Sequence, residues 1–350
     1  MKLIFYRHSL LNRGGDKMVL AHAAHLVSNN HDVTILTNQV NTLFSIDPRI
    51  KITSIKFKGK IGTLVSALLF SYDADWIIAD IIPLACLLST MNRKRVLYFA
   101  QDYDESYYVR SWEKQLIRLA YRFGLSWMKL PSLAVSSSLA CLLRHKFNAD
   151  VSVARNGVDT ARFYPEYSEK LQRSKGGRKC ILILSRSDHR KGFDIAQDTI
   201  QLISMNSPVP VTVWTVGNNA KGKFPDSDHR DFGYVGENEL RSIFSNADIF
   251  LYPTRHEGYG LMVAEAFACK CPVVTTDAVW FASDRVNALV SSAEQVNVIA
   301  KNIIELLTDE GLCHKIVEQG YRFAGENSLS MGLMEFEKRL RDLTTQCDRA

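Results

Sequence analysis

The chain has 350 residues, of which 46% are hydrophobic and 23% charged, a composition typical of globular proteins. This length predicts two domains of ordinary size. No signal peptide and no membrane-spanning helix are predicted, because the apolar runs are short or contain Asp80 and Pro83. Seven cysteines without paired spacing favour reduced thiols in a cytoplasmic protein over disulfides or a zinc site.

Charge is distributed unevenly along the chain. Residues 1–160 contain 20 Lys and Arg against 12 Asp and Glu, whereas the remainder is slightly acidic. The basic first half indicates an anionic surface or acceptor as its partner. A nucleic acid is a poor candidate, because no nucleic-acid-binding motif accompanies the charge.

The first half of the chain alternates between predicted strands and helices. Short apolar runs are each followed by a stretch with helical periodicity, such as residues 16–30. Buried strands separated by helices predict an α/β fold, a parallel sheet covered on both faces. The predicted strands are 2–7, 32–37, 75–80, 95–100 and 132–137, and residues 150–158 close the series.

A polar stretch at about residues 157–178, with Pro165 and two adjacent glycines, is the predicted linker. After it the alternation restarts, so the chain is expected to form two doubly wound, Rossmann-like domains, residues 1–160 and 161–330. Ligands are then expected in a central cleft, outside the carboxyl ends of the strands. The amphipathic helix at about 331–350 is expected to pack on one of the two lobes. Elements predicted in the second half are strands 180–186, 210–217 and 248–253 and helices 193–204 and 237–247.

Two loops have the composition of a phosphate-binding site. Gly14 and Gly15 follow a strand and precede a helix, so their backbone can approach an anion closely, although a plain turn fits equally well. Arg186 and Lys191 flank a loop directly after a strand, and the next helix starts just beyond them. Two cations beside a helix N-terminus suit a diphosphate, and the alternative is a solvated basic loop.

The segment 255–274 places two carboxylates eight residues apart. Glu257 lies in a glycine-rich turn, and Glu265 falls about one and a half turns into an apolar helix that begins near Gly260. A buried unpaired carboxylate is costly, so Glu265 lies either on an exposed helix edge or at a binding site. A helix start favours phosphate, and a carboxylate beyond it can accept hydrogen bonds from sugar hydroxyls.

The pattern E-G-aromatic-G-x4-E-A followed by PVV resembles the E-x7-E signature of GT-B glycosyltransferases of the family 4 type, the glycosyl transferases group 1. Further segments in the same order are similar to that family and extend the resemblance over most of the chain. They are the early Gly-Gly, residues 155–165, 186–192 and 233–254. The resemblance implies the GT-B fold, a nucleoside-diphosphate sugar as the donor, a generally retaining reaction and no metal or other cofactor.

The resemblance also implies roles for individual residues. Arg186 and Lys191 match the pair that neutralises the donor diphosphate, and Glu257 matches the carboxylate that orients the donor sugar. Glu265 matches the carboxylate that holds the donor ribose. Catalytic candidates are therefore Glu257, Arg186 and Lys191, and the donor site adds Gly14, Gly15, Gly258, Tyr259, Gly260, Leu261 and Glu265. The physics agrees, because preorganised cations and N–H dipoles stabilise a departing diphosphate.

Three departures from the family pattern stand out. Lys270 replaces the usual glycine at the end of the signature helix, which therefore lacks its left-handed glycine. Residues 275–284 lack the usual Gly-Gly and Glu, which leaves donor identity open. Gln101 stands where a His is common and, with Asp102, is a candidate for the acceptor side. Asp102 and Asp104 also form a D-x-D, but the two-lobe pattern argues against the metal-dependent glycosyltransferases that use one.

Four basic residues recur every fourth position along a predicted helix in the first domain, next to Trp and Tyr. This pattern predicts a membrane-surface helix facing anionic lipid, and a solvated helix covering the first lobe is the alternative. The membrane-surface candidates are Arg110, Lys114, Arg118 and Arg122.

The sequence thus predicts a retaining glycosyltransferase acting on a glycan or lipid-linked glycan, in bacterial surface polysaccharide assembly. The first domain is expected to bind the acceptor, the second the nucleotide-sugar donor. The expected location is cytoplasmic, and the first domain is the candidate for peripheral contact at the inner face of the membrane. Alternatives are a non-catalytic sugar-nucleotide-binding subunit, or a GT-B-fold epimerase or phosphorylase, for which further acid–base residues or a phosphate site are not identified.

Overall fold

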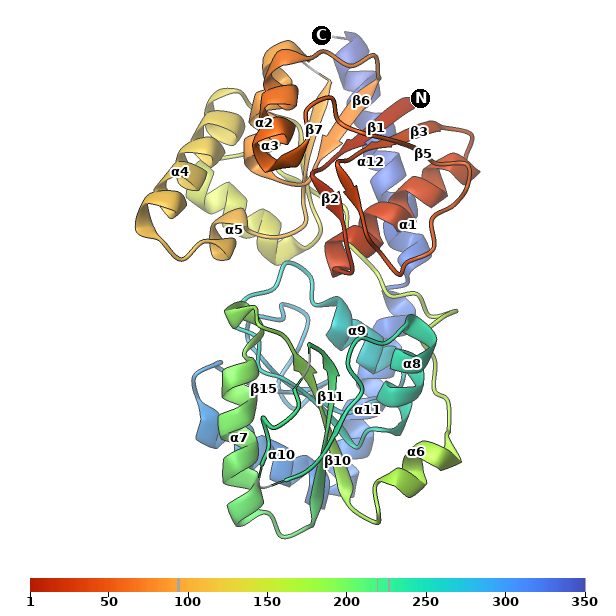
Figure 1. Cartoon of the computed structure of the whole chain (residues 1–350), viewed down its shortest axis with the longest axis vertical. Helices are drawn as coiled ribbons and strands as arrows, with labels where there is room; N and C mark the ends of the chain where they lie inside the picture. The colour runs from red at the N-terminus through yellow and green to blue at the C-terminus, as the bar shows by residue number, and fades with distance from the viewer. Residues whose placement is uncertain (93–94, 219, 226, 350) are drawn as a thin grey trace. The chain divides into compact units, whose positions relative to one another are not determined.

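A computed structural model describes residues 1–92, 95–218, 220–225 and 227–349 (Figure 1). The chain divides into two compact units, the first made of Met1–Asn156 with Met331–Ala350 and the second of Gly157–Ser330. Each unit is built on a fully parallel sheet, so the parallel α/β architecture predicted for both halves is confirmed. No helix in the described part of the chain is long and apolar enough to span a bilayer.

The first unit contains a seven-stranded sheet in the order β5-β3-β1-β6-β7-β8-β9. The chain winds outward from β1 to β3 and β5, then returns to the other side of β1 and winds outward again from β6. The switch in winding direction therefore lies between β1 and β6. The strands are β1 Lys2–Tyr6, β3 Asp32–Leu36, β5 Lys51–Thr53, β6 Trp76–Ala79, β7 Val96–Ala100, β8 Ser132–Ala134 and β9 Ser152–Val153, and β2 Ser9–Leu10 pairs separately with β4 Gln39–Val40.

Helices cover both faces of this sheet, because alternate residues of its strands point to opposite sides. On β7, Phe99 packs against His22 of α1 and Phe336 of α12, whereas Tyr98 packs against Tyr121 of α4. Helices α2, α3 and α4 lie side by side (Figure 1). The helices are α1 Gly14–Ser28, α2 Gly59–Leu69, α3 Ile82–Met91, α4 Ser111–Tyr121, α5 Ser137–Phe147 and α12 Leu329–Arg349, with the 3₁₀ turn η1 Asp104–Tyr107 and the π-helical turn η2 Arg122–Trp127.

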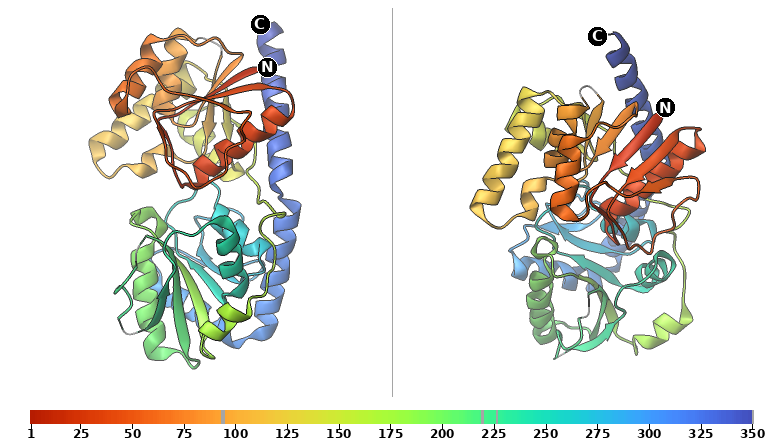
Figure 2. Two further views of the ribbon diagram at one scale, coloured as in Figure 1. Left: turned by 45° about the vertical axis from the view of Figure 1, so that its right-hand side comes forward. Right: turned by 45° about the horizontal axis from the view of Figure 1, so that its top comes forward.

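The C-terminal helix α12 belongs to the first unit and runs beside α1 (Figure 2). Its Glu337 accepts hydrogen bonds from Asn29 and Arg341 and contacts the imidazole rings of His25 and His31. Burial opposes ionisation of Glu337, but these partners together lower its pKa to about 2. A charged, hydrogen-bonded carboxylate thus fixes the last helix to α1 and to the loop that follows it.

The second unit contains a six-stranded sheet in the order β12-β11-β10-β13-β14-β15. Winding starts at β10, moves outward to β12 and then resumes at β13 on the opposite side of β10, so the switch lies between β10 and β13. The strands are β10 Lys179–Ser185, β11 Val211–Gly217, β12 Asp228–Asp231, β13 Ile249–Tyr252, β14 Val273–Thr276 and β15 Leu289–Ser291. The helices are α6 Glu169–Ser174, α7 Phe193–Asn206, α8 Glu237–Asn246, α9 Leu261–Ala268, α10 Val296–Thr308 and α11 Glu310–Glu326, with the 3₁₀ turn η3 His189–Lys191.

The predicted linker at 157–178 belongs mostly to the second unit. Glu166 accepts hydrogen bonds from Arg241 and Ser242 of α8, and the segment contains the short helix α6. Gly157 is required here, because a Cβ at this position would lie 2.2 Å from the Ser328 carbonyl oxygen. The chain therefore enters and leaves the second unit at one place, where Val158 pairs with Ser328. The linker prediction was wrong for most of this segment, because side-chain contacts order it.

Candidate functional site

The switch point of the second sheet brings together the two loops that the sequence singled out. The loop after β10 begins at Arg186, and the loop after β13 runs through Glu257 to the start of α9. Adjacent parallel strands place their carboxyl ends at one edge, and ligands of open α/β sheets bind in the crevice where the winding reverses. Arg186 is half-buried there, and its charge acts on the neighbouring Tyr252.

Glu257 and Lys191 form a direct ion pair. The Lys191 ammonium donates to Glu257 Oε1 at 2.7 Å, and the two side chains are only 12% and 9% exposed. The sequence predicted both residues at the site but not their contact. Among the residues that the structure describes, Glu257 accepts hydrogen bonds through Oε1 and none through Oε2.

Tyr252, the last residue of β13, supplies a second donor to the same oxygen. Its hydroxyl donates to Glu257 Oε1 at 2.5 Å. Burial, reinforced by the Glu257 charge, raises the pKa of Tyr252 well above its usual range, so the phenol remains a neutral donor. Thr254 Oγ1 lies 3.2 Å from Glu257 Oε1, but its single proton is closer to the Arg190 carbonyl oxygen at 2.9 Å. Tyr252 is therefore the neutral hydrogen-bond donor of the pair.

Two backbone features hold the β10 and β13 loops together. Gly192 has a φ of 67°, and a Cβ at this position would lie 1.9 Å from the Pro253 carbonyl oxygen. Only glycine permits this approach without strain. The Arg255 amide also donates to the Arg190 carbonyl oxygen at 2.7 Å. Lys191 is thus held against the end of β13, within reach of Glu257.

The start of α9 is preorganised for an anion. Gly260 is the N-cap, with a φ of 99°, and Leu261 is the first helical residue. Gly258 and Tyr259 are buried in the turn before it. Glu265 is 5% exposed, which excludes the exposed helix edge considered from sequence. The N-terminal end of a helix carries a partial positive charge, so the start of α9 favours an anion.

The segment 275–284 packs against the α9 turn. A Cβ on Gly260 would lie 3.1 Å from Val279 and 3.4 Å from Phe281. The Tyr259 ring meets Phe281 at 5.5 Å and Trp280 at 6.1 Å between ring centroids. An aromatic cluster thus supports this turn, where the related family commonly has glycines.

Lys270 adopts the left-handed conformation itself, with a φ of 57°. The glycine is therefore missing from the end of α9, but the left-handed turn is not. Its ammonium donates to Glu318 at 2.8 Å and lies 4.8 Å from the centroid of the Tyr321 ring. These contacts offset a backbone cost of about 1–2 kcal/mol for a residue with a side chain.

In the first unit, the predicted Gly14 and Gly15 are the first two residues of α1 rather than a loop before it. Gln101, at the end of β7, donates to the Gly15 carbonyl oxygen at 3.2 Å, so two predicted residues meet. The fully buried Asp16 accepts hydrogen bonds from Arg7 and Arg13. The start of α1 is thus fixed by charges that the sequence did not single out.

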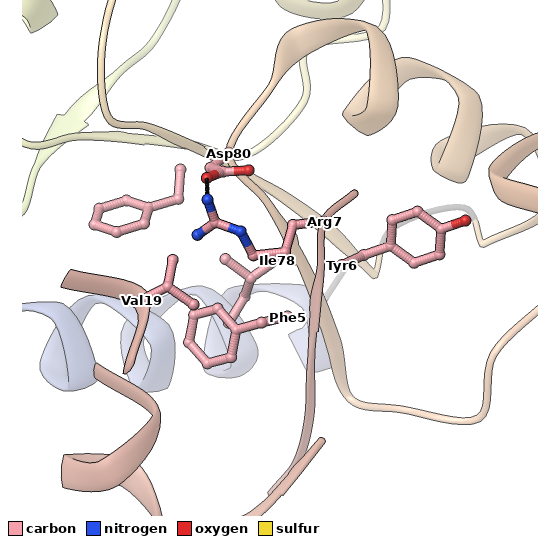
Figure 3. Close-up of a pocket in the computed structure, with 7 residues that line it drawn as sticks. Phe5, Tyr6, Arg7, Val19, Ile78 and Asp80 are labelled. Atoms are coloured by element: carbon pink, nitrogen blue, oxygen red, sulfur yellow. Dashed lines mark ion pairs between the residues drawn. The ribbon is translucent and has the colours of Figure 1, made fainter. Parts of the chain in front are cut away.

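Arg7 also pairs with Asp80 across the switch point of the first sheet, at 3.3 Å (Figure 3). The guanidinium lies among Phe5, Val19 and Ile78 in a small pocket between β1 and β6. Arg7 Nη1 and Asp80 Oδ1 are buried and have no hydrogen-bond partner within the described residues. This pair was missed from sequence, where Asp80 was considered only as an interruption of an apolar run.

The D-x-D at the end of β7 is not arranged as a metal site. Asp104 is 3% exposed and accepts a hydrogen bond from the Ile82 amide at 2.6 Å. Burial raises the pKa of Asp104 well above its usual range, which favours the neutral acid over the charged metal ligand. Asp102 accepts from the Tyr103 amide and is 9% exposed. Among the described residues no cluster of three or more His, Cys, Asp or Glu is placed to hold a metal ion.

The basic residues predicted to face a membrane do not share one regular helix. Arg110 precedes α4, and Arg122 begins the π-helical turn that follows it. Arg118 donates to Glu105 at 2.8 Å, so this charge is neutralised internally, which the sequence did not foresee. Within the described part of the chain no ion pair is found for Arg110, Lys114 or Arg122.

The six cysteines whose side chains are described are free thiols. Burial raises the pKa of Cys86 and Cys269 to about 12. These thiols are therefore poor nucleophiles at neutral pH, as expected for structural cysteines. The side chain of Cys347 lies outside the described residues.

The chain resembles known proteins in sequence and in fold. Residues 178–309 match the family model of the glycosyl transferases group 1, a stretch that contains Arg186, Lys191 and both glutamates. A sucrose-phosphate synthase from Thermosynechococcus elongatus superposes with a TM-score of 0.82 at 14% identity, covering 99% of this chain and 100% of the other. The chain has the GT-B fold. The resemblance to group 1 glycosyltransferases inferred from the sequence is confirmed.

Two further relatives extend the comparison of this GT-B protein. The phosphatidyl-myo-inositol mannosyltransferase of Propionibacterium freudenreichii is 25% identical over 285 residues, which are 80% of this chain and 65% of the relative. The Anabaena protein HepE, solved in complex with UDP-glucose, superposes with a TM-score of 0.77 at 16% identity, covering 98% of this chain and 100% of HepE. The matched region therefore spans just under two thirds of the mannosyltransferase's length.

Proposed function

We propose that this GT-B protein is a retaining glycosyltransferase that transfers a sugar from a nucleoside-diphosphate sugar to a glycan or lipid-linked glycan acceptor. The observation that carries the proposal is the Lys191–Glu257 pair, held at the switch point of a domain that matches the group 1 glycosyltransferases. The UDP-glucose bound to HepE supports a nucleotide sugar as the donor class.

In this proposal the reaction is driven by stabilising the departing nucleoside diphosphate. Arg186 and Lys191 neutralise its charge, and the backbone N–H groups of Tyr259, Gly260 and Leu261 cap the phosphates. Glu257 orients the donor sugar. Glu265 accepts hydrogen bonds from the ribose, and no metal or other cofactor takes part.

Thermal-shift screening of UDP-, GDP- and dTDP-sugars tests the donor class, because a bound ligand raises the unfolding temperature. Glu265→Ala is expected to weaken donor binding at least tenfold, or about 1.4 kcal/mol. Glu257→Gln is expected mainly to lower kcat. Stabilisation by none of these nucleotide sugars would contradict the proposal, and so would wild-type kinetics in both variants.

The acceptor is proposed to lie at an anionic membrane, at the cytoplasmic face, in bacterial surface polysaccharide assembly. The name of the mannosyltransferase relative, which refers to a phosphatidyl-inositol, supports a lipid-linked acceptor. Gln101 and Asp102 are the proposed acceptor-side residues of the first unit.

The membrane contact is supported by helix α2, which buries its small and polar side chains and exposes its large aliphatic ones. Its small or polar residues Thr63, Ser66 and Ala67 are buried, whereas its large aliphatic residues face outward. Neighbouring α4 and its π-helical turn also expose Trp112 and Trp127. The outward residues of α2 are Ile61, Leu64, Val65, Leu68 and Leu69. An exposed apolar patch of this kind marks an interaction surface.

The charge around this surface selects an anionic bilayer as its partner. Residues 48–72, which contain α2, carry five Lys and Arg and no Asp or Glu. Arg49 and Lys51 pair with Asp47 and Asp32, and the other three are Lys56, Lys58 and Lys60 around the start of α2. A second copy of the chain would bring two basic surfaces together, which is unfavourable. Basic side chains beside an aliphatic face suit anionic headgroups above an apolar interior.

Vesicle sedimentation tests the membrane contact. The double variant Ile61→Glu with Leu69→Glu is expected to reduce binding to anionic vesicles at least tenfold. Met205→Glu in α7, equally exposed at 77%, is the control and should bind as the wild type does. Equal binding of the wild type to neutral and anionic vesicles would contradict the electrostatic part, and α2-dependent dimers without vesicle binding would indicate a second copy instead.

A further inference from the structure

The geometry points to a cation exchange at the donor site, and we propose that Tyr252 is the positioning residue that permits it. In this structure Lys191 is held by Glu257, and a diphosphate that binds beside it takes Lys191 over. Tyr252 then remains as the donor to the Glu257 carboxylate. This inference rests on the proposed function, because it assigns a diphosphate to Lys191.

The first step follows from the arrangement of donors on Glu257. Lys191 and Tyr252 both donate to Oε1, at 2.7 and 2.5 Å, and no bond to Oε2 is found among the described residues. Oε1 is therefore the anchored oxygen, and Oε2 is the one left for a hydroxyl of the ligand. A carboxylate fixed through one oxygen keeps a defined orientation, which is what a substrate-orienting group needs.

The second step concerns what happens when Lys191 leaves. Glu257 is only 9% exposed. If Lys191 were its sole donor, the departure of Lys191 would leave an unpaired buried charge, which is costly. Tyr252 prevents this, because its hydroxyl donates to Oε1 independently of Lys191. Its pKa is far above neutral, so it cannot itself carry a competing negative charge.

The third step is competition. A Lys ammonium is a compact point charge on a flexible stem, so it can exchange one oxygen anion for another nearby. Glu257 and a diphosphate therefore compete for the same cation in the free protein. Removing the Glu257 charge should free Lys191 for the diphosphate, and removing the Tyr252 hydroxyl should bind Lys191 more tightly to Glu257.

Calorimetric titration with inorganic pyrophosphate, the group shared by all nucleoside diphosphates, tests this exchange. Glu257→Gln is expected to bind pyrophosphate about five- to tenfold more tightly than the wild type, and Tyr252→Phe about threefold more weakly. In a Lys191→Ala background both changes in pyrophosphate affinity should largely disappear, because each depends on how tightly Glu257 holds the Lys191 ammonium. Such a cycle isolates the coupling between two residues, which a merely structural role of Tyr252 would not produce.

Tyr98→Phe is the matched control, because it removes a buried tyrosine hydroxyl whose hydrogen-bond partner, Tyr121, belongs to the first unit. It should leave pyrophosphate binding unchanged. If Glu257→Gln tightens binding equally with and without Lys191, simple repulsion explains it and the exchange is refuted. If the wild type binds and turns over a nucleotide sugar but Tyr252→Phe binds pyrophosphate normally, the inference fails alone. If the wild type binds neither pyrophosphate nor any nucleotide sugar, the proposed function fails with it.

Discussion

The two units place an ion pair at the same topological position, the switch point of a parallel sheet, and enclose it differently. In the first unit Arg7 joins Asp80 and Asp16 among aromatic and aliphatic side chains, and Asp16 is completely buried. In the second unit Lys191 and Glu257 lie beside the glycine-rich start of α9. The switch point thus carries a buried arginine cluster in the first unit and a single lysine–glutamate pair in the second.

The two pairs differ in whether the cation can leave its carboxylate without leaving buried groups unpaired. Arg7 is held by two carboxylates and by the Ser9 carbonyl oxygen, so its release would leave several buried groups unpaired. Lys191 has one carboxylate partner, and Tyr252 remains on that carboxylate if Lys191 moves. We therefore expect variants of the first pair to lower stability and variants of the second pair to lower ligand binding.

The largest expected effect is on the first pair. Asp16→Asn should destabilise the protein by about 3–5 kcal/mol, because it leaves the Arg7 charge buried with too little compensation. Urea unfolding followed by circular dichroism measures this change. Asp73→Asn, which breaks an exposed pair with Lys2, is the control and should cost less than about 1 kcal/mol. Equal costs for the two variants would contradict the structural role of the Arg7 cluster.

The second pair should respond in the opposite way. Lys191→Ala is expected to lower kcat/KM about 100-fold, or about 2.7 kcal/mol of transition-state stabilisation. Its unfolding free energy should change by less than about 1.5 kcal/mol, because Tyr252 still donates a hydrogen bond to Glu257. Steady-state kinetics and urea unfolding of the same preparation give both numbers. The exposed Arg173→Ala serves as the control for a lost cation in this unit. A stability loss of several kcal/mol in Lys191→Ala would mean that the two pairs are alike.

Glu337 on α12 gives an intermediate case with a defined pH dependence. Its folded pKa of about 2 lies below the ordinary 4.5, so the stabilisation is complete above pH 4.5 and is lost as the pH falls through 2. Glu337→Gln is expected to cost about 1–2 kcal/mol at pH 7. The gap between wild type and variant should narrow steadily when urea unfolding is repeated at pH 4 and pH 2.5. A gap that stays constant with pH would exclude the charge as its cause.

The smallest expected effects concern two lysines, one in each unit, whose backbone adopts the left-handed conformation. Lys129→Gly should stabilise the first unit by about 1 kcal/mol, because glycine adopts a φ of 51° without strain. Lys270→Gly should gain less, since it also loses the pair with Glu318 and the Tyr321 contact. Thermal unfolding of both variants tests the order. A larger gain for Lys270→Gly would show that those contacts contribute nothing.

Helix α2 shows where reasoning from sequence stopped. In the sequence, the α2 segment is one of the apolar runs that are too short to span a bilayer. Helical periodicity shows which of its residues share a face, but not which face packs against the rest of the protein. The strand before it, β5, lies at the edge of the sheet, where a helix has fewer neighbours to cover it. Helix α9, which follows the interior strand β13, is covered almost completely, including Glu265. Strands β2, β4, β5, β12, β14 and β15 were not predicted. Edge strands β5 and β12 have no buried residue, so they lack the continuous apolar run by which the other strands were recognised.

The sequence by itself determined the two βα arrays, the glycines that allow close backbone approach, and the residue types of the candidate donor site. These are local properties, set by periodicity and by the backbone freedom of glycine. Only the tertiary structure decided that Lys191 pairs with Glu257, that Tyr252 shares the same oxygen, and that Arg7 joins Asp16 and Asp80. Such pairs depend on which strands become neighbours at a switch point. Their members are between 5 and 73 residues apart in the chain, and no local pattern encodes that proximity.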